Sequence, residues 1–70
     1  MGPEAKSAVP VLAAIVREKS VKPGLRHAAA DALGEIGSAA KESIPDLNKA
    51  KVESDVGPAA AEALEKIQGD

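Results

Sequence analysis

The sequence predicts an all-α fold in which two helical hairpins, with four main helices, stack as a short α-solenoid. The first observation is an internal repeat, because residues 2–16 (GPEAKSAVPVLAAIV) align with residues 37–51 (GSAAKESIPDLNKAK). Residues 25–36 (LRHAAADALGEI) align in the same way with residues 56–67 (VGPAAAEALEKI). The second observation is that apolar residues recur at spacings of three and four, as in amphipathic helices. Repeats of about 20–50 residues are typical of stacked helical units.

The alignment divides a single domain, residues 1–70, into repeat one, residues 2–36, and repeat two, residues 37–68. The first halves of the repeats are offset by 35 positions and the second halves by 31. Repeat two is therefore shorter, and the difference falls at the segment REKSVKPG, residues 17–24, or its counterpart. This segment is expected to be a loop, because it holds proline and glycine and because loops accept changes in length at little entropic cost.

Repeat one is expected to begin with a short helical turn over residues 3–8, followed by a main helix from Pro10 to about Glu18. The break is expected at Pro10 because proline donates no backbone hydrogen bond and its ring clashes with the preceding turn. Residues 19–23 are expected to form a loop. The apolar face of the helix consists of Val9, Leu12, Ile15 and Val16.

The second helix of repeat one is expected to start at Pro23 and to end at Glu35 or Ile36. Proline is favoured in the first turn of a helix, where its missing N–H would have no partner. Gly37 is expected to end the helix, since glycine adopts the left-handed conformation common at C-termini. The apolar positions of this helix are Leu25, Ala28, Ala29, Ala32, Leu33 and Ile36.

Repeat two is expected to contain the same elements in the same order: a turn over residues 39–43, a helix from Pro45 to about Val52, and a final helix ending at about Gln68. Ser54 or Asp55 is the expected N-cap of the final helix. The first helix of this repeat is more polar, because Asp46, Asn48, Lys49 and Lys51 replace Val11, Ala13, Ala14 and Val16. A more polar face fits a helix at the end of a stack, where one side meets water.

The composition argues against several classes of site. The chain has no cysteine, one histidine and no aromatic residue, so it lacks disulfides, cysteine or multi-histidine metal sites, and aromatic platforms for nucleic-acid bases. A formal net charge of −2 also argues against a nucleic-acid partner. No apolar run approaches the about 20 residues of a membrane span, and the N-terminal residues lack the apolar region of a signal peptide. We therefore expect no cofactor, no metal, no nucleic-acid or membrane partner, and a cytoplasmic location.

These motifs resemble the HEAT repeat family, and most closely its short, alanine-rich bacterial form, the PBS-lyase-like HEAT repeat. The matching positions of repeat one are Pro10, Leu12, Leu25, Arg26, Ala28, Ala29, Ala32, Leu33, Gly34, Ile36 and Gly37. Those of repeat two are Pro45, Leu47, Val56, Ala59, Ala60, Ala63, Leu64 and Ile67. The resemblance covers nearly the whole chain. It implies a non-enzymatic scaffold that binds other proteins.

The resemblance also implies a ladder of ion pairs along the stack, in which an arginine at the start of the second helix meets an aspartate of a turn. Arg26 matches the arginine in repeat one, whereas Gly57 occupies the same position in repeat two. The turn aspartate is not evident in either repeat. At least three repeats are usually needed to bury a continuous core. The chain is therefore expected to belong to a longer array, to be an excised module, or to associate.

The predicted partner-binding residues are Arg26, His27, Asp31, Glu62 and Glu65. In the family the second helix of each pair lines the concave surface, so the resemblance places these residues there. His27 and Asp31 are spaced like a general base and the carboxylate that orients it. An exposed ion pair between positions i and i+4 explains them better, and no catalytic residue is expected. The acidic residues also fit a solvated helix face.

The open ends of the stack are a second candidate surface. Exposed apolar patches commonly bind a partner, and the candidates on the N-terminal side are Val11, Ala14, Val21 and Leu25. The partner is an unidentified protein or, through self-association, another copy of the chain. The leading hypothesis is thus a non-enzymatic protein–protein interaction or scaffold module. The alternatives are a designed or excised repeat fragment without an evolved partner, and an accessory domain like the phycobilin lyases, which the lack of aromatic residues disfavours.

Overall fold

A computed structural model describes residues 3–69, and all regular elements within this range are helical. In chain order they are α1 (Pro3–Arg17), α2 (Pro23–Ile36), the 3₁₀ helix η1 (Gly37–Ser43), α3 (Ile44–Ala50) and α4 (Gly57–Gln68). The all-helical prediction is confirmed over this range, whereas the predicted start of repeat one at Gly2 lies outside it. No helix between residues 3 and 69 is long and apolar enough to cross a bilayer.

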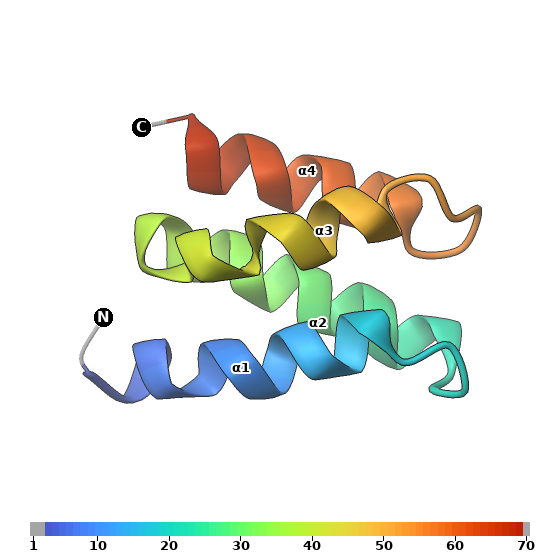
Figure 1. The fold of residues 1–70 in the computed structure, drawn as a ribbon, viewed down its shortest axis with the longest axis horizontal. Coiled ribbons are helices and arrows are strands. Elements are labelled where there is room, and N and C mark those ends of the chain that lie inside the picture. Colours follow the sequence, from blue (N-terminus) through green and yellow to red (C-terminus); the bar gives the residue numbers. More distant parts are fainter. Residues whose placement is uncertain (1–2, 70) are drawn as a thin grey trace.

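The chain runs back and forth, so that α1 and α2 form one antiparallel pair and α3 and α4 form a second (Figure 1). In addition, α2 packs against α4, and α1 packs against α3. Among the described residues, the core between them contains six fully buried aliphatic side chains larger than alanine: Val9, Val16, Leu33, Leu47, Val56 and Ile67. The two pairs thus share one core.

Helix α1 is continuous, and the predicted break at Pro10 is wrong because this residue lies inside the helix. Pro10 is exposed, whereas Val9, Ala13 and Val16 are buried. The missing hydrogen bond and the ring therefore lie on the solvent side, where a helix can bend at modest cost. Packing of the buried side holds the two halves of the helix in line.

Helix α2 begins at Pro23 and ends at Ile36, as predicted. Gly37 follows with a φ of 74°, and its N–H donates a hydrogen bond to the carbonyl of Leu33. This left-handed conformation favours glycine because it has no Cβ. The turn redirects the chain into η1, which occupies the region of the predicted turn and leads directly into α3.

Helix α3 is shorter than predicted, because it ends at Ala50 rather than near Val52. The chain then turns toward α4, and the N–H of Gly57 donates to the carbonyl of Glu53 at 2.9 Å. A Cβ at Gly57 would lie 2.7 Å from the carbonyl oxygen of Lys51. The turn is thus too tight at this position for any side chain.

The predicted side-chain cap of α4 is wrong. Its N-cap is Val56, and no side chain caps the helix. Asp55 instead accepts a hydrogen bond from the N–H of Val56, at 2.7 Å, just before the helix. Its carboxylate is drawn away from the first turn because it also contacts Arg26 of α2.

Candidate interaction surface

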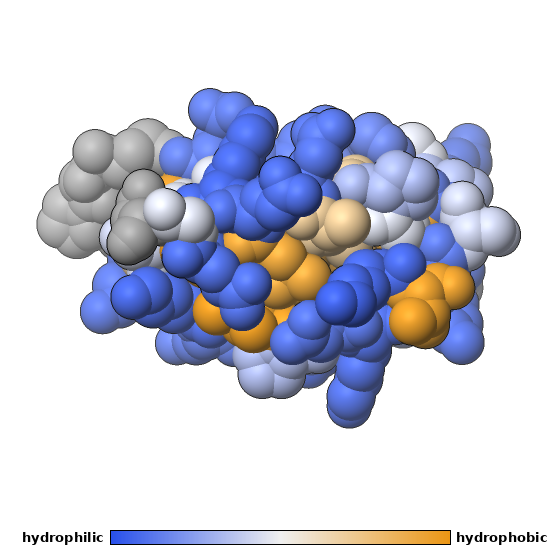
Figure 2. All heavy atoms as spheres, turned by 90° about the horizontal axis from the view of Figure 1, so that it is seen from above, coloured by the Kyte–Doolittle hydropathy of each residue, from blue (hydrophilic) through white to orange (hydrophobic). Residues whose placement is uncertain are grey.

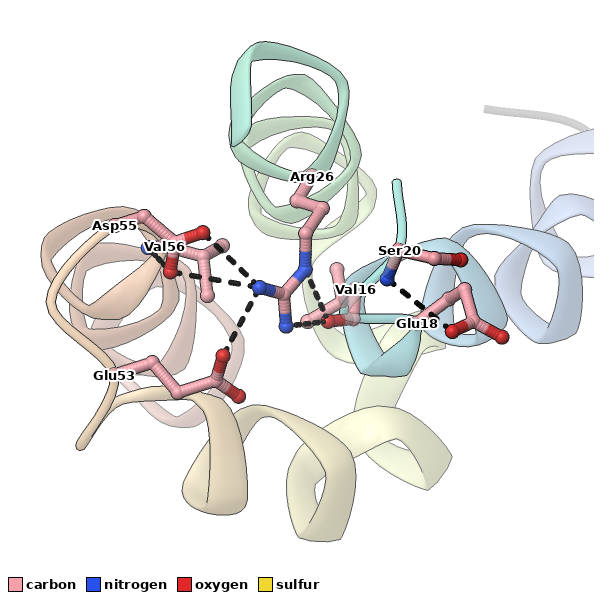
Figure 3. A network of polar contacts seen from close by, with 7 residues as sticks. All are labelled: Val16, Glu18, Ser20, Arg26, Glu53, Asp55 and Val56. Atoms are coloured by element: carbon pink, nitrogen blue, oxygen red, sulfur yellow. Dashed lines mark hydrogen bonds and ion pairs between the residues drawn. The ribbon is translucent and has the colours of Figure 1, made fainter. Parts of the chain in front are cut away.

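Arg26, in the first turn of α2, is the largest fully buried side chain, with only 1% exposed. Its Nε and Nη2 donate to the carbonyl oxygen of Val16, near the end of α1, at 3.0 and 2.6 Å. Its Nη1 lies 2.9 Å from Oε1 of Glu53 and 3.1 Å from Oδ2 of Asp55. Figure 3 shows the guanidinium between the end of α1 and the turn that precedes α4. One side chain therefore joins both helix pairs.

The charges of this cluster stabilise one another. The hydrogen bond with Glu53 is the main reason that the pKa of Arg26 is raised, and Asp55 adds to the effect, while burial opposes it. The pKa of Asp55 is lowered, first by the hydrogen bond from the N–H of Val56, with a further contribution from the charge of Arg26. Arg26 and Asp55 are thus charged at neutral pH, and the polar atoms of the guanidinium are satisfied internally.

We expected Arg26 to contact a partner, but the structure encloses it within the chain. A partner cannot reach this guanidinium, so we leave it out of the binding surface. Asp55 is the turn aspartate that was not evident in the sequence. It lies in the turn of the second helix pair and serves the arginine of the first pair. The signal in the sequence is an acidic turn whose aspartate follows Arg26 by 29 residues.

The remaining predicted residues lie on the exposed side of α2 and α4. His27 and Asp31 are about half exposed, and Nδ1 of the histidine lies 3.5 Å from Oδ2 of the aspartate. Beside them, Nζ of Lys66 on α4 lies 3.2 Å from Oε2 of Glu35 on α2. We use the name outer strip for the exposed residues His27, Asp31, Glu35, Glu62, Glu65 and Lys66.

Lys66 adds a positive charge among the acidic residues of the outer strip, which the sequence did not indicate. The hydrogen bond with Glu35 is the main cause that raises the pKa of Lys66, and the charges of Glu62 and Asp31 raise it further. The structure thus gathers three carboxylates around one ammonium group, and the strip is partly neutralised within the chain. Within residues 3–69 no three His, Cys, Asp or Glu side chains are placed to hold a metal ion.

An exposed apolar surface lies on the first helix pair, whereas Val52, after α3, is a separate aliphatic side chain that is 81% exposed. Val11 and Leu25 are each 61% exposed, and exposed apolar residues are informative where they form a contiguous patch. A shallow groove of about 530 Å³ lies beside them on α1, lined by Pro10, Val11, Ala14, Ile15, Glu18 and Val21. The groove contains three of the four residues expected at the N-terminal end of the stack, and the fourth, Leu25, is exposed at the start of α2.

Equivalent positions of the two helix pairs differ in exposure. Leu25 is 61% exposed, whereas its counterpart Val56 is fully buried. Ala28 is exposed, whereas its counterpart Ala59 is only 2% exposed. Because both pairs have the same layout, the difference arises from the neighbour: the first pair covers the second, and no described residue covers the first. We use the name open face for Val11, Leu12, Ile15, Leu25, Ala28 and Ala32.

Comparison with family models gives a match over one segment of the chain. Residues 25–53 match the family model of the PBS lyase HEAT-like repeat. The match covers less than half of the chain and runs from α2 through η1 to the turn after α3. The chain matches none of the curated proteins and none of the solved structures with which it was compared. The segment from Leu25 to Glu53 is therefore similar to a PBS lyase HEAT-like repeat, which supports the resemblance to the HEAT-like repeat family.

Proposed function

We propose that this chain is a non-enzymatic protein–protein interaction module, in which two HEAT-like hairpins stack as a short α-solenoid. In this proposal the open face packs against helices of a partner protein. The observation that carries the proposal is the contrast between Leu25, 61% exposed, and Val56, fully buried at the same position of the second hairpin. The same kind of surface is covered in one hairpin and open in the other. HEAT-like repeats are scaffolds of this kind, since each unit buries its apolar surface against a neighbour.

The interior supports this proposal because its buried polar side chains form hydrogen bonds within the chain. Among the described residues, every buried side-chain nitrogen or oxygen has a hydrogen-bond partner. The buried guanidinium of Arg26 ties the two hairpins together through Val16, Glu53 and Asp55. The framework that presents the open face is therefore fixed before binding, which reduces the entropy lost when a partner docks.

The open face is a better candidate for the principal contact than the outer strip. Covering an apolar side chain stabilises a complex by about 25 cal/mol per Å² of buried area. The charges of the outer strip are partly paired inside the chain, as in Lys66 with Glu35, and exposed ion pairs contribute little. We propose that His27, Asp31, Glu62 and Glu65 contact the rim of a partner, where charge affects orientation and association rate more than affinity.

The proposal can be tested by photo-crosslinking in an extract of the source cells. A photoreactive residue is placed at position 28 of the open face or, for comparison, at position 62 of the outer strip. Captured proteins are identified, purified and assayed for binding to the wild type, to Leu25→Glu and to the matched charge variant Glu62→Lys. Both substituted side chains are exposed, so each variant should keep the fold, as circular dichroism would check.

We expect position 28 to crosslink to a helical segment of the captured protein. Leu25→Glu should weaken that protein's binding about 30-fold or more, as for a central apolar contact, which corresponds to about 2 kcal/mol. Glu62→Lys should change the dissociation constant only a few-fold. Binding that is insensitive to Leu25→Glu but lost in Glu62→Lys would transfer the function to the outer strip and overturn the proposal.

A further inference from the structure

The two open ends of the stack differ in chemistry at equivalent positions. Six apolar positions of the second hairpin are at most 2% exposed although their counterparts in the first hairpin are half-buried or exposed, as expected where the second hairpin packs against the first: Leu47, Ala50, Val56, Ala59, Ala63 and Ile67. The first hairpin has an apolar residue at each of these positions, namely Leu12, Ile15, Leu25, Ala28, Ala32 and Ile36. The N-terminal end of the stack therefore retains every apolar residue that a repeat uses to dock onto a preceding one.

The opposite end of the stack, over α3 and α4, is more polar at the equivalent positions. Four residues of the first hairpin are buried where the second hairpin has an exposed one: Ala13, Val16, Ala30 and Gly34. Their counterparts are Asn48, Lys51, Ala61 and Glu65, all of them exposed. Figure 2 shows this side of the molecule from above α4, where hydrophilic side chains surround a central apolar area and a second apolar area lies at the right. A following repeat would have to cover a lysine, an asparagine and a glutamate.

Glu65 is also a steric obstacle at this end. Its counterpart Gly34 lies so close to α4 that an added Cβ would be 3.1 Å from Cα of Ala63 and 3.2 Å from Cδ of Lys66. A following helix in the same geometry would meet the whole side chain of Glu65 at this place. The close helix approach used between the two hairpins cannot be repeated after α4.

Charges at the N-terminal end narrow the kind of partner that fits. Counted back from the second helix of each pair, Lys22 and Gly24 stand where the second hairpin has Glu53 and Asp55. A partner that offered an arginine at the position of Arg26 would find a lysine instead of the two carboxylates. A partner with a neutral or acidic residue at that position would avoid this repulsion or pair with Lys22.

Building on the proposed function, we infer that the open face binds a helical hairpin of one particular kind. Its second helix carries glycine at the position of Gly34 and a neutral or acidic residue at the position of Arg26. The face over α3 and α4 ends the stack, because Asn48, Lys51 and Glu65 prevent another copy of this chain from docking there. The module is thus one-sided: it accepts one hairpin and does not extend itself.

A variant of the chain itself provides the probe for this inference. The donor carries Asn48→Ala, Lys51→Val and Glu65→Gly, which restore the residues of the first hairpin at its terminal face. Leu25→Glu is added so that the donor's own open face is closed. Its Gly57 supplies the neutral residue at the position of Arg26. The donor is mixed with wild-type chain, and the mass in solution is measured by sedimentation equilibrium with refractive-index detection.

Three controls isolate the contact. The first carries Leu25→Glu alone and so keeps the native terminal face. The second carries Leu25→Glu with Lys49→Val and Glu62→Gly, which are the same types of substitution at exposed positions outside the terminal set. The third replaces the wild-type receiver by Leu25→Glu. A simpler donor, Leu25→Glu with Glu65→Gly, serves if the full donor does not fold by circular dichroism.

We expect a 1:1 complex of donor and wild type, at least about 30-fold tighter than with any control, equivalent to about 2 kcal/mol. Failure of a folded donor to bind, or equal binding by the second control, would overturn the inference. Self-association of the wild-type chain through Leu25 that does not depend on the residue at position 65 would also overturn the inference. The same result would support the proposed function. Failure of the donor therefore remains distinct from failure of the extract experiment, in which Leu25 is tested against a natural partner.

Discussion

Two ion-pair sites join α2 to the second hairpin. Their nitrogen–oxygen distances are similar, but the exposure of their side chains differs. Arg26 lies 2.9 Å from Glu53, and its side chain is 2% exposed. Lys66 lies 3.2 Å from Glu35, and these side chains are 50% and 71% exposed. Water can replace either partner at the second site but not the guanidinium at the first. Burial, rather than separation, therefore decides how much the fold depends on each site.

The largest effect is expected from Arg26→Ala. The substitution opens a cavity and leaves the carbonyl of Val16 without its donor and Glu53 and Asp55 without their counter-ion. Breaking a buried charge cluster costs about 3–5 kcal/mol, which is close to the whole stability of a domain of this size, about 3–5 kcal/mol. Circular dichroism at 25 °C should show a largely unfolded chain. A thermal midpoint close to that of the wild type would contradict the role assigned to burial.

A smaller loss of stability is expected from a substitution at Gly34, next to the exposed pair of Lys66 and Glu35. Gly34→Leu forces a side chain into the α2–α4 contact, 3.1 Å from the backbone of Ala63, and overpacking of this kind costs about 1–3 kcal/mol. Urea unfolding of Gly24→Leu provides the matched control, because a Cβ there meets nothing within 4 Å. The comparison of the two ion-pair sites would need revision if both glycine variants unfolded at the same urea concentration.

Acid should weaken the buried cluster through Asp55. Its pKa is lowered in the folded state from the ordinary value of 3.8. A lowered pKa contributes stability that is fully present above the unfolded value and is lost as the pH falls through the folded one. Asp55→Asn should thus be less stable than the wild type at pH 7, and the gap between their urea midpoints should narrow below about pH 4. A gap that stays constant down to pH 2 would rule out this linkage. Glu62→Gln, outside the cluster, serves as the reference.

The smallest effect is expected from Lys66→Ala. Its pKa is raised by Glu35, so its contribution is present below the ordinary value of 10.5 and is lost only as the pH rises through the folded value. Because both partners are exposed, the urea midpoint at pH 7 should equal that of the wild type within error. A loss comparable to that of Arg26→Ala would show that exposure does not separate the two sites.

Much of the helical layout could be predicted from the repeat and its apolar spacing. The start of α2 at Pro23 and its end before Gly37 follow from local chemistry, since both residues have strong backbone preferences. Pro10 was misjudged because its cost depends on which side of α1 meets the core, and one helix alone does not show that. The N-cap of α4 was misjudged because Asp55 is attracted by Arg26, a residue distant in sequence.

The candidate surface was predicted less completely than the fold. Val11 and Leu25 could be identified as candidates because they are large apolar residues of the first repeat, and both are 61% exposed. Arg26 was misplaced because a charged residue in sequence is assumed to face water, whereas here two carboxylates and a carbonyl replace the water. Lys66 was missed because its proximity to Glu35 depends on how closely α2 approaches α4, which Gly34 and Ala63 determine together.

The position of Arg26 has a consequence for how the chain folds. Its guanidinium holds a carbonyl of α1 and two carboxylates from the turn before α4, so the first hairpin alone would lack both counter-ions and the contact that covers this side chain. In the language of one-dimensional cooperative models, the coupling between units then outweighs the intrinsic stability of each unit. The two hairpins should therefore fold and unfold as one cooperative unit, and amide hydrogen exchange in α1 and α4 should proceed with the same opening free energy.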